Sequence, residues 1–264
     1  MPLFQSFKRS VYKNNSFVQK NYFYKPAMRN SVLKDALNSW GESDQVISWN
    51  QLSLEATAAS VVGPTVCARL FSYLNTATYD SWAFFDQKAI GSIYNAGKEN
   101  NLFKLLKSAG VSSFNVIKLE KIFKFSSGLE KKVIEAGLRK AVIDVSTSQV
   151  LSEISTSFFQ DEAVPQDLAV KTNNLLKDSL EDLLVLGKQT AKLIRDIAFE
   201  VGGQISSSIN TYALDDRSNQ TNFYADTTDY QVSPSVFDSN QPNPTLDKFW
   251  RPLENQKICD SSMG

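Results

Sequence analysis

The stretch from Gly63 to Asp86, GPTVCARLFSYLNTATYDSWAFFD, contains the clearest helix start in the chain. Pro64 suits the first helical position, where its missing backbone N–H leaves no hydrogen bond unmade, and Gly63 lets the chain turn just before it. At about 100° per residue, one broad face of this helix collects mostly apolar side chains. They are Cys67, Leu70, Phe71, Leu74, Ala77, Trp82 and Phe85. The segment therefore predicts a long amphipathic helix.

A narrow polar strip lies on the opposite side of the same helix and consists of Arg69, Tyr73, Thr76 and Asp80. The strip has two interpretations. A run of polar side chains on one helix face usually meets solvent. The strip can also be a structural polar seam, buried or half-buried, in which Arg69 and Asp80 tie the helix to a neighbour. The tyrosine and threonine between the two charges keep this second interpretation open.

The rest of the chain shows a series of helical patterns separated by recognisable breaks. Ser127-x-x-Glu130 is a capping box, in which each residue satisfies a free backbone N–H of the other at a helix start. It predicts a long helix running towards Phe158. The other expected features are a helix capped by Ser43 or Asp44, one or two shorter helices between 98 and 125 split at Gly110, and two helices after a break at Pro165, themselves separated near Gly187.

Composition supports a helical fold. A chain of 264 residues is long enough to bury a sizeable core, and 42% hydrophobic with 21% charged residues is typical of globular proteins. Only 11 glycines and 8 prolines argue against the frequent turns of a sandwich or barrel. We therefore predict an all-α fold: a basic, aromatic N-terminal arm over 1–42, a helical bundle over 43–212 and an irregular C-terminal tail over 213–264.

The charge of the chain is unevenly distributed. The formal net charge is zero, yet residues 1–34 contain seven basic residues and no acid. Aromatic residues alternate with these charges, which leaves three alternatives: an arm that packs its aromatics on the bundle, a contact with a charged surface, or an organellar transit peptide. Neither a nucleic acid nor a membrane is indicated strongly. Because no apolar run is long enough to span a bilayer, a cytoplasmic protein is expected.

Several unusual clusters resemble the N-terminal helical region of the bacterial vanadium-dependent haloperoxidases, relatives of the type-2 phosphatidic acid phosphatases. GPTVCAR and TATYDSWAFFD within 63–86 carry the resemblance most clearly. Ser48-Trp49-Asn50 and Ala56-Thr57-Ala58-Ala59-Ser60 precede them, and Asp216-Arg217-Ser218-Asn219, Tyr224-Ala225-Asp226-Thr227-Thr228-x-Tyr230 and Trp250-Arg251-Pro252-Leu253 follow. The resemblance spans roughly 45 to 255. It implies a helical bundle wrapped by the tail, and it favours the polar seam.

The active site of that family is not found in this sequence. In the family, Lys, Arg and backbone donors hold vanadate, one His is its axial ligand and a second His acts as acid/base. This chain contains no histidine. Its only Arg-Pro, Arg251-Pro252, has Pro244 where the lysine of the family pattern belongs. We therefore expect no catalytic, cofactor-binding or metal-binding residues and no cofactor, although the full-length family uses vanadate.

Two functions follow as hypotheses. The chain is either the non-catalytic scaffold half of a haloperoxidase-like protein, or a stand-alone helical interaction protein with a basic N-terminal arm. The expected partner is a catalytic half supplied by another chain, or a second copy of this chain. For self-association, the apolar stripe from Ala191 to Ile209 is the expected adhesive element, since its spacing is close to a heptad repeat.

Overall fold

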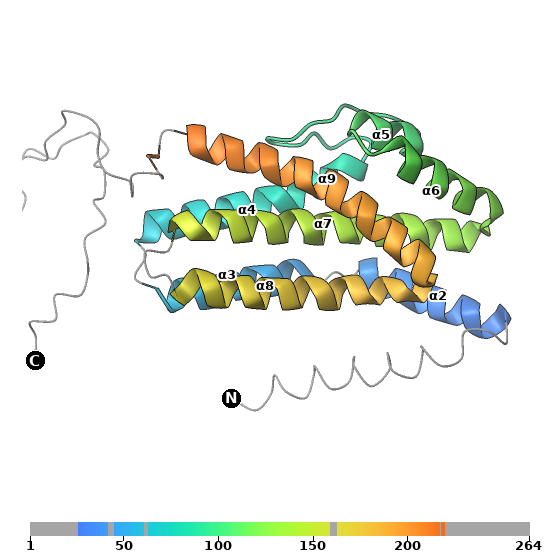
Figure 1. Cartoon of the computed structure of the whole chain (residues 1–264), viewed down its shortest axis with the longest axis horizontal. Helices are drawn as coiled ribbons and strands as arrows, with labels where there is room; N and C mark the ends of the chain where they lie inside the picture. Colours follow the sequence, from blue (N-terminus) through green and yellow to red (C-terminus); the bar gives the residue numbers. More distant parts are fainter. Residues whose placement is uncertain (1–25, 42–44, 61–62, 159–162, 217, 220–264) are drawn as a thin grey trace, which may run out of the picture.

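The computed structural model describes residues 26–41, 45–60, 63–158, 163–216 and 218–219. These residues contain eight α-helices, one 3-10 helix and no strand, so the predicted all-α class is confirmed. The helices form an elongated bundle (Figure 1). The predicted tail after residue 219, the arm before residue 26 and the predicted caps Ser43 and Asp44 lie outside the described residues.

The helices follow one another without interruption by other secondary structure. They are α2 (Pro26–Gly41), α3 (Gln45–Ala58), α4 (Pro64–Phe85), α5 (Leu102–Ser108), α6 (Ser113–Phe125), α7 (Gly128–Phe158), α8 (Ala163–Glu181), the 3-10 helix η1 (Asp182–Leu186) and α9 (Lys188–Asp215). None of them is both long enough and apolar enough to cross a membrane.

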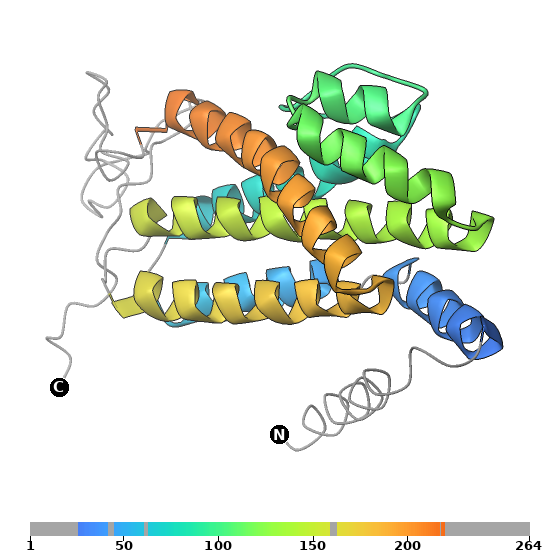
Figure 2. The ribbon, with the colours of Figure 1, turned by 45° about the vertical axis from the view of Figure 1, so that its right-hand side comes forward.

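Helix α7 is the centre of the bundle. It packs against α2, α4, α8 and α9, and in Figures 1 and 2 it runs between α4 and α9 on one side and α3 and α8 on the other. Such a position requires apolar side chains on more than one face. Accordingly, Val133, Leu138, Val142, Val145 and Leu151 of α7 are fully buried.

The predicted helix boundaries are confirmed where a local signal specifies them. Gly63 precedes Pro64 at the first position of α4. In the capping box before α7, the Ser127 backbone N–H donates to Glu130 Oε2 at 2.8 Å, and the Glu130 N–H donates to Ser127 Oγ at 3.3 Å. The breaks at Gly110 and Gly187 have φ of +73° and +87°, a left-handed conformation that glycine adopts without strain.

Two predicted boundaries differ from the structure. The N-terminal arm was predicted to extend to residue 42, but α2 begins at Pro26 and places Leu33 and Trp40 in the core. The bundle therefore starts well before residue 43. The break expected at Pro165 falls slightly earlier, because α7 ends at Phe158 and α8 begins at Ala163. Pro165 lies in the first turn of α8, where a missing backbone N–H is tolerated.

The buried face of α4 also differs from the prediction. Trp82, expected on the apolar face, is 39% exposed, whereas Tyr73 and Asp80 of the polar strip are buried. The reason is that α4 contacts α3, α7 and α9, so its buried surface is wider than a single apolar stripe. Hydrophobicity alone therefore does not identify the side of α4 that faces the core.

The apolar stripe of α9 is not available for self-association. Ala191, Ile194, Ala198, Val201, Ile205 and Ile209 are all buried inside the bundle. Most of the contacts of α9 are with α7. The expectation that this stripe is an adhesive surface is therefore wrong.

Candidate functional site

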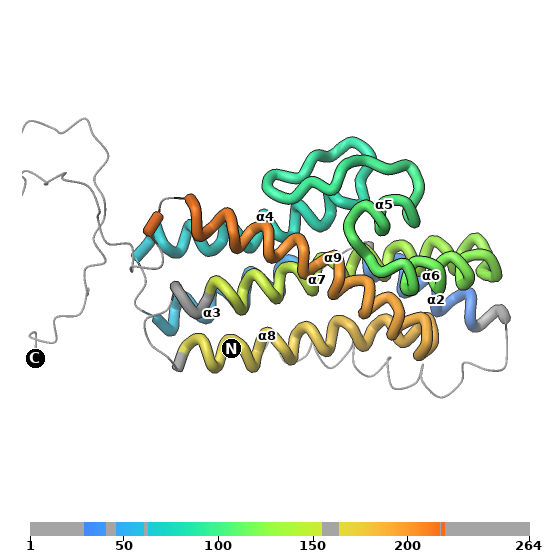
Figure 3. Tube along the Cα trace, turned by 45° about the horizontal axis from the view of Figure 1, so that its top comes forward, coloured from blue at the N-terminus to red at the C-terminus, as the bar shows by residue number. Residues whose placement is uncertain are grey.

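A cleft of about 990 Å³ lies between α2, α3, α4, α7 and the segment that follows α4. Figure 3 shows that segment beside α5, at one end of α4. Aromatic side chains line the cleft together with charged ones: Trp40, Tyr79, Trp82, Phe85, Glu99, Lys132, Glu135, Arg139, Lys140 and Asp144. A concave site with apolar walls and a few polar groups is typical of ligand-binding clefts.

Tyr79 and Trp82 of α4 form the aromatic part of the wall. Their ring centroids are 5.9 Å apart, and both side chains are about two-fifths exposed. The Tyr79 hydroxyl donates to the Ile90 carbonyl at 3.0 Å, which fixes the ring against the segment after α4. With Tyr79 anchored and Trp82 packed beside it, the two partly exposed rings offer a flat apolar surface to a ligand.

Charged side chains of α7 form another part of the wall. Lys132, Glu135 and Arg139 lie three or four residues apart, so they share one helix face. The Arg139 guanidinium carbon lies 5.8 Å from the centroid of the Phe85 ring. Cations and carboxylates therefore alternate along this wall, and the wall has no strong preference for a ligand of one charge.

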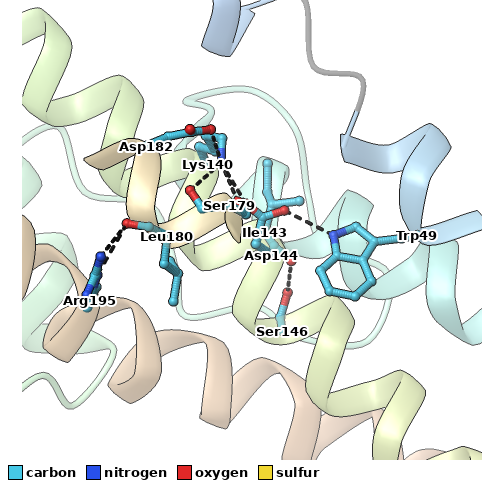
Figure 4. Close-up of polar contacts among 9 residues, drawn as sticks. All are labelled: Trp49, Lys140, Ile143, Asp144, Ser146, Ser179, Leu180, Asp182 and Arg195. Atoms are coloured by element: carbon cyan, nitrogen blue, oxygen red, sulfur yellow. Dashed lines mark hydrogen bonds and ion pairs between the residues drawn. The ribbon is translucent and has the colours of Figure 1, made fainter. Parts of the chain in front are cut away.

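The floor of the cleft contains a buried ionic cluster (Figure 4). Asp144 is fully buried and accepts hydrogen bonds from the Trp49 indole at 3.0 Å, from Lys140 Nζ at 3.2 Å and from the Ser179 hydroxyl. Lys140 also donates to the Ser179 carbonyl at 3.0 Å. A buried charge is tolerated only when it is paired and hydrogen-bonded, and both conditions are met here.

Asp182 of η1 completes the cluster at its more exposed edge. Its carboxylate lies 3.8 Å from Lys140 Nζ. Burial raises the pKa of Asp182, Lys140 opposes that rise, and the carboxylates of Asp144 and Asp178 add to it. Arg195 of α9 donates to the Leu180 carbonyl at 2.7 Å, satisfying an acceptor at the end of α8 (Figure 4).

The cluster joins helices and does not have the geometry of a nucleophilic site. Ser179 lies beside Lys140, a combination that some hydrolases use, but Ser179 is buried and is not part of the cleft wall. Lys140 is paired with the carboxylates of Asp144 and Asp182. The cluster therefore links α3, α7, α8 and η1. Any contact with a ligand in the cleft has to come from the side chains of the cleft walls.

The structure divides the predicted polar strip into two parts. At one end, Arg69 Nε donates to Asp216 Oδ2 at 2.8 Å, Arg69 Nη2 donates to the Ala213 carbonyl at 2.5 Å, and the Tyr73 hydroxyl also donates to Asp216. These contacts join α4 to the end of α9. Thr76, partly buried, is the member of the strip between this group and Asp80.

Asp80 forms the other part of the strip, away from Asp216. Its fully buried carboxylate accepts the backbone N–H groups of Ser92, Ile93 and Tyr94 at 2.6–3.0 Å. Arg69 and Asp80 are therefore not partners of each other. Each of them connects α4 to a different segment of the chain.

The contact between Arg69 and Asp216 changes the pKa values of the groups that take part in it. Burial alone would raise the pKa of the Asp216 carboxyl, but hydrogen bonds from Arg69, Tyr73 and Ser218 lower it to about 2. Burial, together with the hydrogen bond to Asp216, raises the pKa of the Tyr73 phenol. This contact is therefore a charge-assisted hydrogen-bond network between α4 and the end of α9.

Several of these residues do not stand out in the sequence pattern. Lys140 and Asp144 are four residues apart within the apolar stripe of α7, a pattern that indicates a buried pair when both neighbouring faces are apolar. No sequence pattern indicated that Asp216 would contact Arg69, apart from its position in a segment that resembles the family. Among the described residues, no group of histidine, cysteine, aspartate and glutamate side chains is placed to hold a metal ion.

Comparisons of the chain with models of protein families, with curated proteins and with solved structures gave no match.

Proposed function

We propose that this chain is the non-catalytic helical scaffold of a vanadium-dependent haloperoxidase-like protein, and that it lacks the vanadate site. The observation that carries the proposal is the contact of Arg69 with Asp216. These residues belong to two of the segments that resemble the family, although 147 positions separate them. If the chain preserves the scaffold of that family, segments that resemble the family are expected to pack against each other, as these two do.

The residues of the cleft do not fit a vanadate site. An oxyanion of this kind needs fixed cations and an axial imidazole, and the sequence contains no histidine. Of the cations in the cleft, Lys140 is already paired with Asp144 and Asp182. Glu99 and Glu135 add negative charge to the same walls. We therefore infer that any halide chemistry belongs to a different polypeptide segment.

The coding DNA around this chain tests the proposal. We expect a reading frame, continuous with this one or separate, that encodes Ser-Gly-His together with the lysine and Arg-Pro pattern of the family. The segment that encodes these motifs, expressed and purified apart from this chain in either case, should form a complex with it at micromolar concentration in size-exclusion chromatography. A genomic neighbourhood without such a frame, or two products that elute separately, would contradict the proposal.

The alternative is a stand-alone interaction protein. The partly exposed pair Tyr79 and Trp82 beside an open cleft favours this function. The basic arm that the alternative also uses lies outside the described residues up to residue 25. A chain that stays monomeric and ignores the histidine-containing product would support this alternative over the scaffold.

A further inference from the structure

The outward face of α6 combines lysines with unusually exposed apolar side chains. Phe114 is 67% exposed, Ile117 47% and Phe125 84%. Lys118, Lys121 and Lys124 of the same helix are exposed as well. We call these six residues the α6 face.

Counted from Phe114, the other five residues lie three, four, seven, ten and eleven positions along the helix, so at about 100° per residue all six fall within about one third of its circumference. The opposite side of α6, with Val116, Leu119 and Phe123, is buried against α5 and α9. In Figure 2, α5 and α6 project to one side of the other helices. The α6 face therefore points away from the bundle.

The lysines lie among the apolar groups of this face. Lys118 Nζ is 3.9 Å from the centroid of the Phe114 ring, and Lys124 Nζ is 5.9 Å from that of Phe125. The nearest acid on the helix, Glu120, lies outside the face and is 3.8 Å from Lys107. The α6 face therefore carries a charge of +3 and no carboxylate.

We propose that the α6 face binds the surface of an anionic phospholipid bilayer. Lysines attract the negative lipid headgroups, and phenylalanine and isoleucine gain free energy on entering the boundary between headgroups and acyl chains. Single exposed apolar side chains are common on soluble proteins, but three of them gathered on one helix face form a patch of the kind that often marks a binding surface. The proposal goes beyond the scaffold function and does not depend on it.

The composition of the face favours a membrane over a nucleic acid. The three lysines can contact nucleic-acid phosphates as well as lipid headgroups, but the face has no Arg, Asn or Gln to pair with base edges. Ile117 also has no flat ring to stack on a base. Phe125 is the most exposed of these side chains and has no polar atom. It therefore gains more free energy from entering the hydrocarbon of a bilayer than from lying against the polar surface of a nucleic acid.

Vesicle sedimentation with the full chain tests the proposal. We expect binding to vesicles of phosphatidylcholine and phosphatidylserine in equal parts, little binding to phosphatidylcholine alone, and weaker binding at high salt. The triple variant K118Q/K121Q/K124Q should bind the anionic vesicles about a hundredfold more weakly, since each lysine near the surface contributes about fivefold. The double variant F114Q/F125Q should lose at least about tenfold.

Matched controls use exposed residues on other helices and loops. K34Q/K171Q/K177Q removes the same charge from α2 and α8, and V170Q/I90Q removes two apolar side chains that are at least 60% exposed. Both controls should bind anionic vesicles nearly as well as the parent chain. Circular dichroism should show that all variants keep their helices, because none of the replaced side chains is buried.

The proposal is overturned if the parent chain does not bind anionic vesicles, or if the α6 variants bind as well as the controls. Loss of binding in the lysine variant alone would show that no apolar group enters the bilayer, which also contradicts the proposal. A labelled single-stranded DNA that binds more tightly than the vesicles, and is released by the α6 variants, would identify a nucleic acid as the partner instead.

Discussion

Asp80 organises the segment after α4 because its carboxylate is the acceptor for three consecutive backbone N–H groups. We expect Asp80→Asn to destabilise the protein by about 2–3 kcal/mol, since the amide removes the charge and one of the two acceptor oxygens from a buried site. Urea unfolding measures the change. Asp196→Asn, an exposed carboxylate on α9, should change stability by less than about 0.5 kcal/mol. If both variants changed stability equally little, the hydrogen bonds of Asp80 would not stabilise the fold, and Asp80 would behave like a residue in contact with solvent.

Arg69 and Asp216 make stability dependent on acid pH. The pKa of Asp216 is about 2 in the folded protein, below its usual value of 3.8. The carboxylate therefore contributes stability above about pH 4 that is lost as the pH falls towards 2, an effect of about 2 kcal/mol. Because this contact lies near the protein surface, solvent screening reduces the effect to about 1–2 kcal/mol. Arg69→Ala should weaken this pH dependence.

The measurement is the free energy of unfolding in urea at several pH values between 2 and 6, for the parent chain, Arg69→Ala and Asp216→Asn. The parent chain should lose more stability than either variant as the pH falls through that range. Asp196→Asn serves as the control and should follow the parent. Parallel curves for all four proteins would show that the contact of Arg69 with Asp216 contributes nothing.

At the scale of the elements, the packing of α7 on α9 depends on one glycine. A Cβ atom added to Gly202 would lie 2.8 Å from Val145 Cγ1 and 3.0 Å from the Ser146 backbone nitrogen. Gly202→Ala should therefore destabilise the protein by about 1–3 kcal/mol, although alanine is the better helix former. Urea unfolding of the single variant gives the value.

The neighbouring glycine is the matched control for this prediction. At Gly203 an added Cβ would be 3.8 Å from the nearest atom, Gln149 Oε1. Gly203→Ala should be neutral or stabilise the protein by up to about 1 kcal/mol, because only helix propensity changes. If Gly202→Ala stabilised the protein as much as Gly203→Ala, α7 and α9 would not pack as closely as the structure shows.

Much of the element structure could be predicted from sequence because its signals are local. The capping box at Ser127 and the glycines at 110 and 187 affect only the few residues around them. The start of α7 and the breaks at the two glycines can therefore be predicted from the local sequence. The helix α2 was missed because its mixed composition has little amphipathic pattern. Its place in the bundle is fixed by distant contacts such as that of Trp40 with Gly137.

The candidate site was less predictable, and for a physical reason. Trp49 and Asp144 are 95 positions apart, and Lys140 and Ser179 are 39 apart. No periodicity along one helix identifies a partner on another. The polar strip on α4 was visible as a pattern, but its division between Asp216 and the segment after α4 depends on tertiary contacts.

At the scale of the whole molecule, self-association has to use a surface other than α9. Ile47 and Leu54 are seven positions apart on α3, so they share a face, and both are more than half exposed. The formal net charge of zero also weakens repulsion between copies. We predict that light scattering gives a mass above 29.5 kDa at micromolar concentration, and that I47K/L54K lowers it.

The double variant F114Q/F125Q is the control for the oligomer, since it changes exposed apolar residues of α6 and leaves α3 intact. It should associate like the parent chain. A parent chain that is monomeric at all concentrations would contradict this prediction and favour the stand-alone function.

The most direct test of the scaffold function is vanadate-dependent bromination of a phenol-red reporter with peroxide. It is measured for this chain alone, for the product of the frame that encodes Ser-Gly-His alone, and for the two mixed in equal amounts. Because this chain has no histidine to ligate vanadate, we predict no activity from it alone. The mixture should be clearly more active than the second product by itself. Bromination by this chain alone, or a mixture no more active than the second product, would contradict the scaffold function.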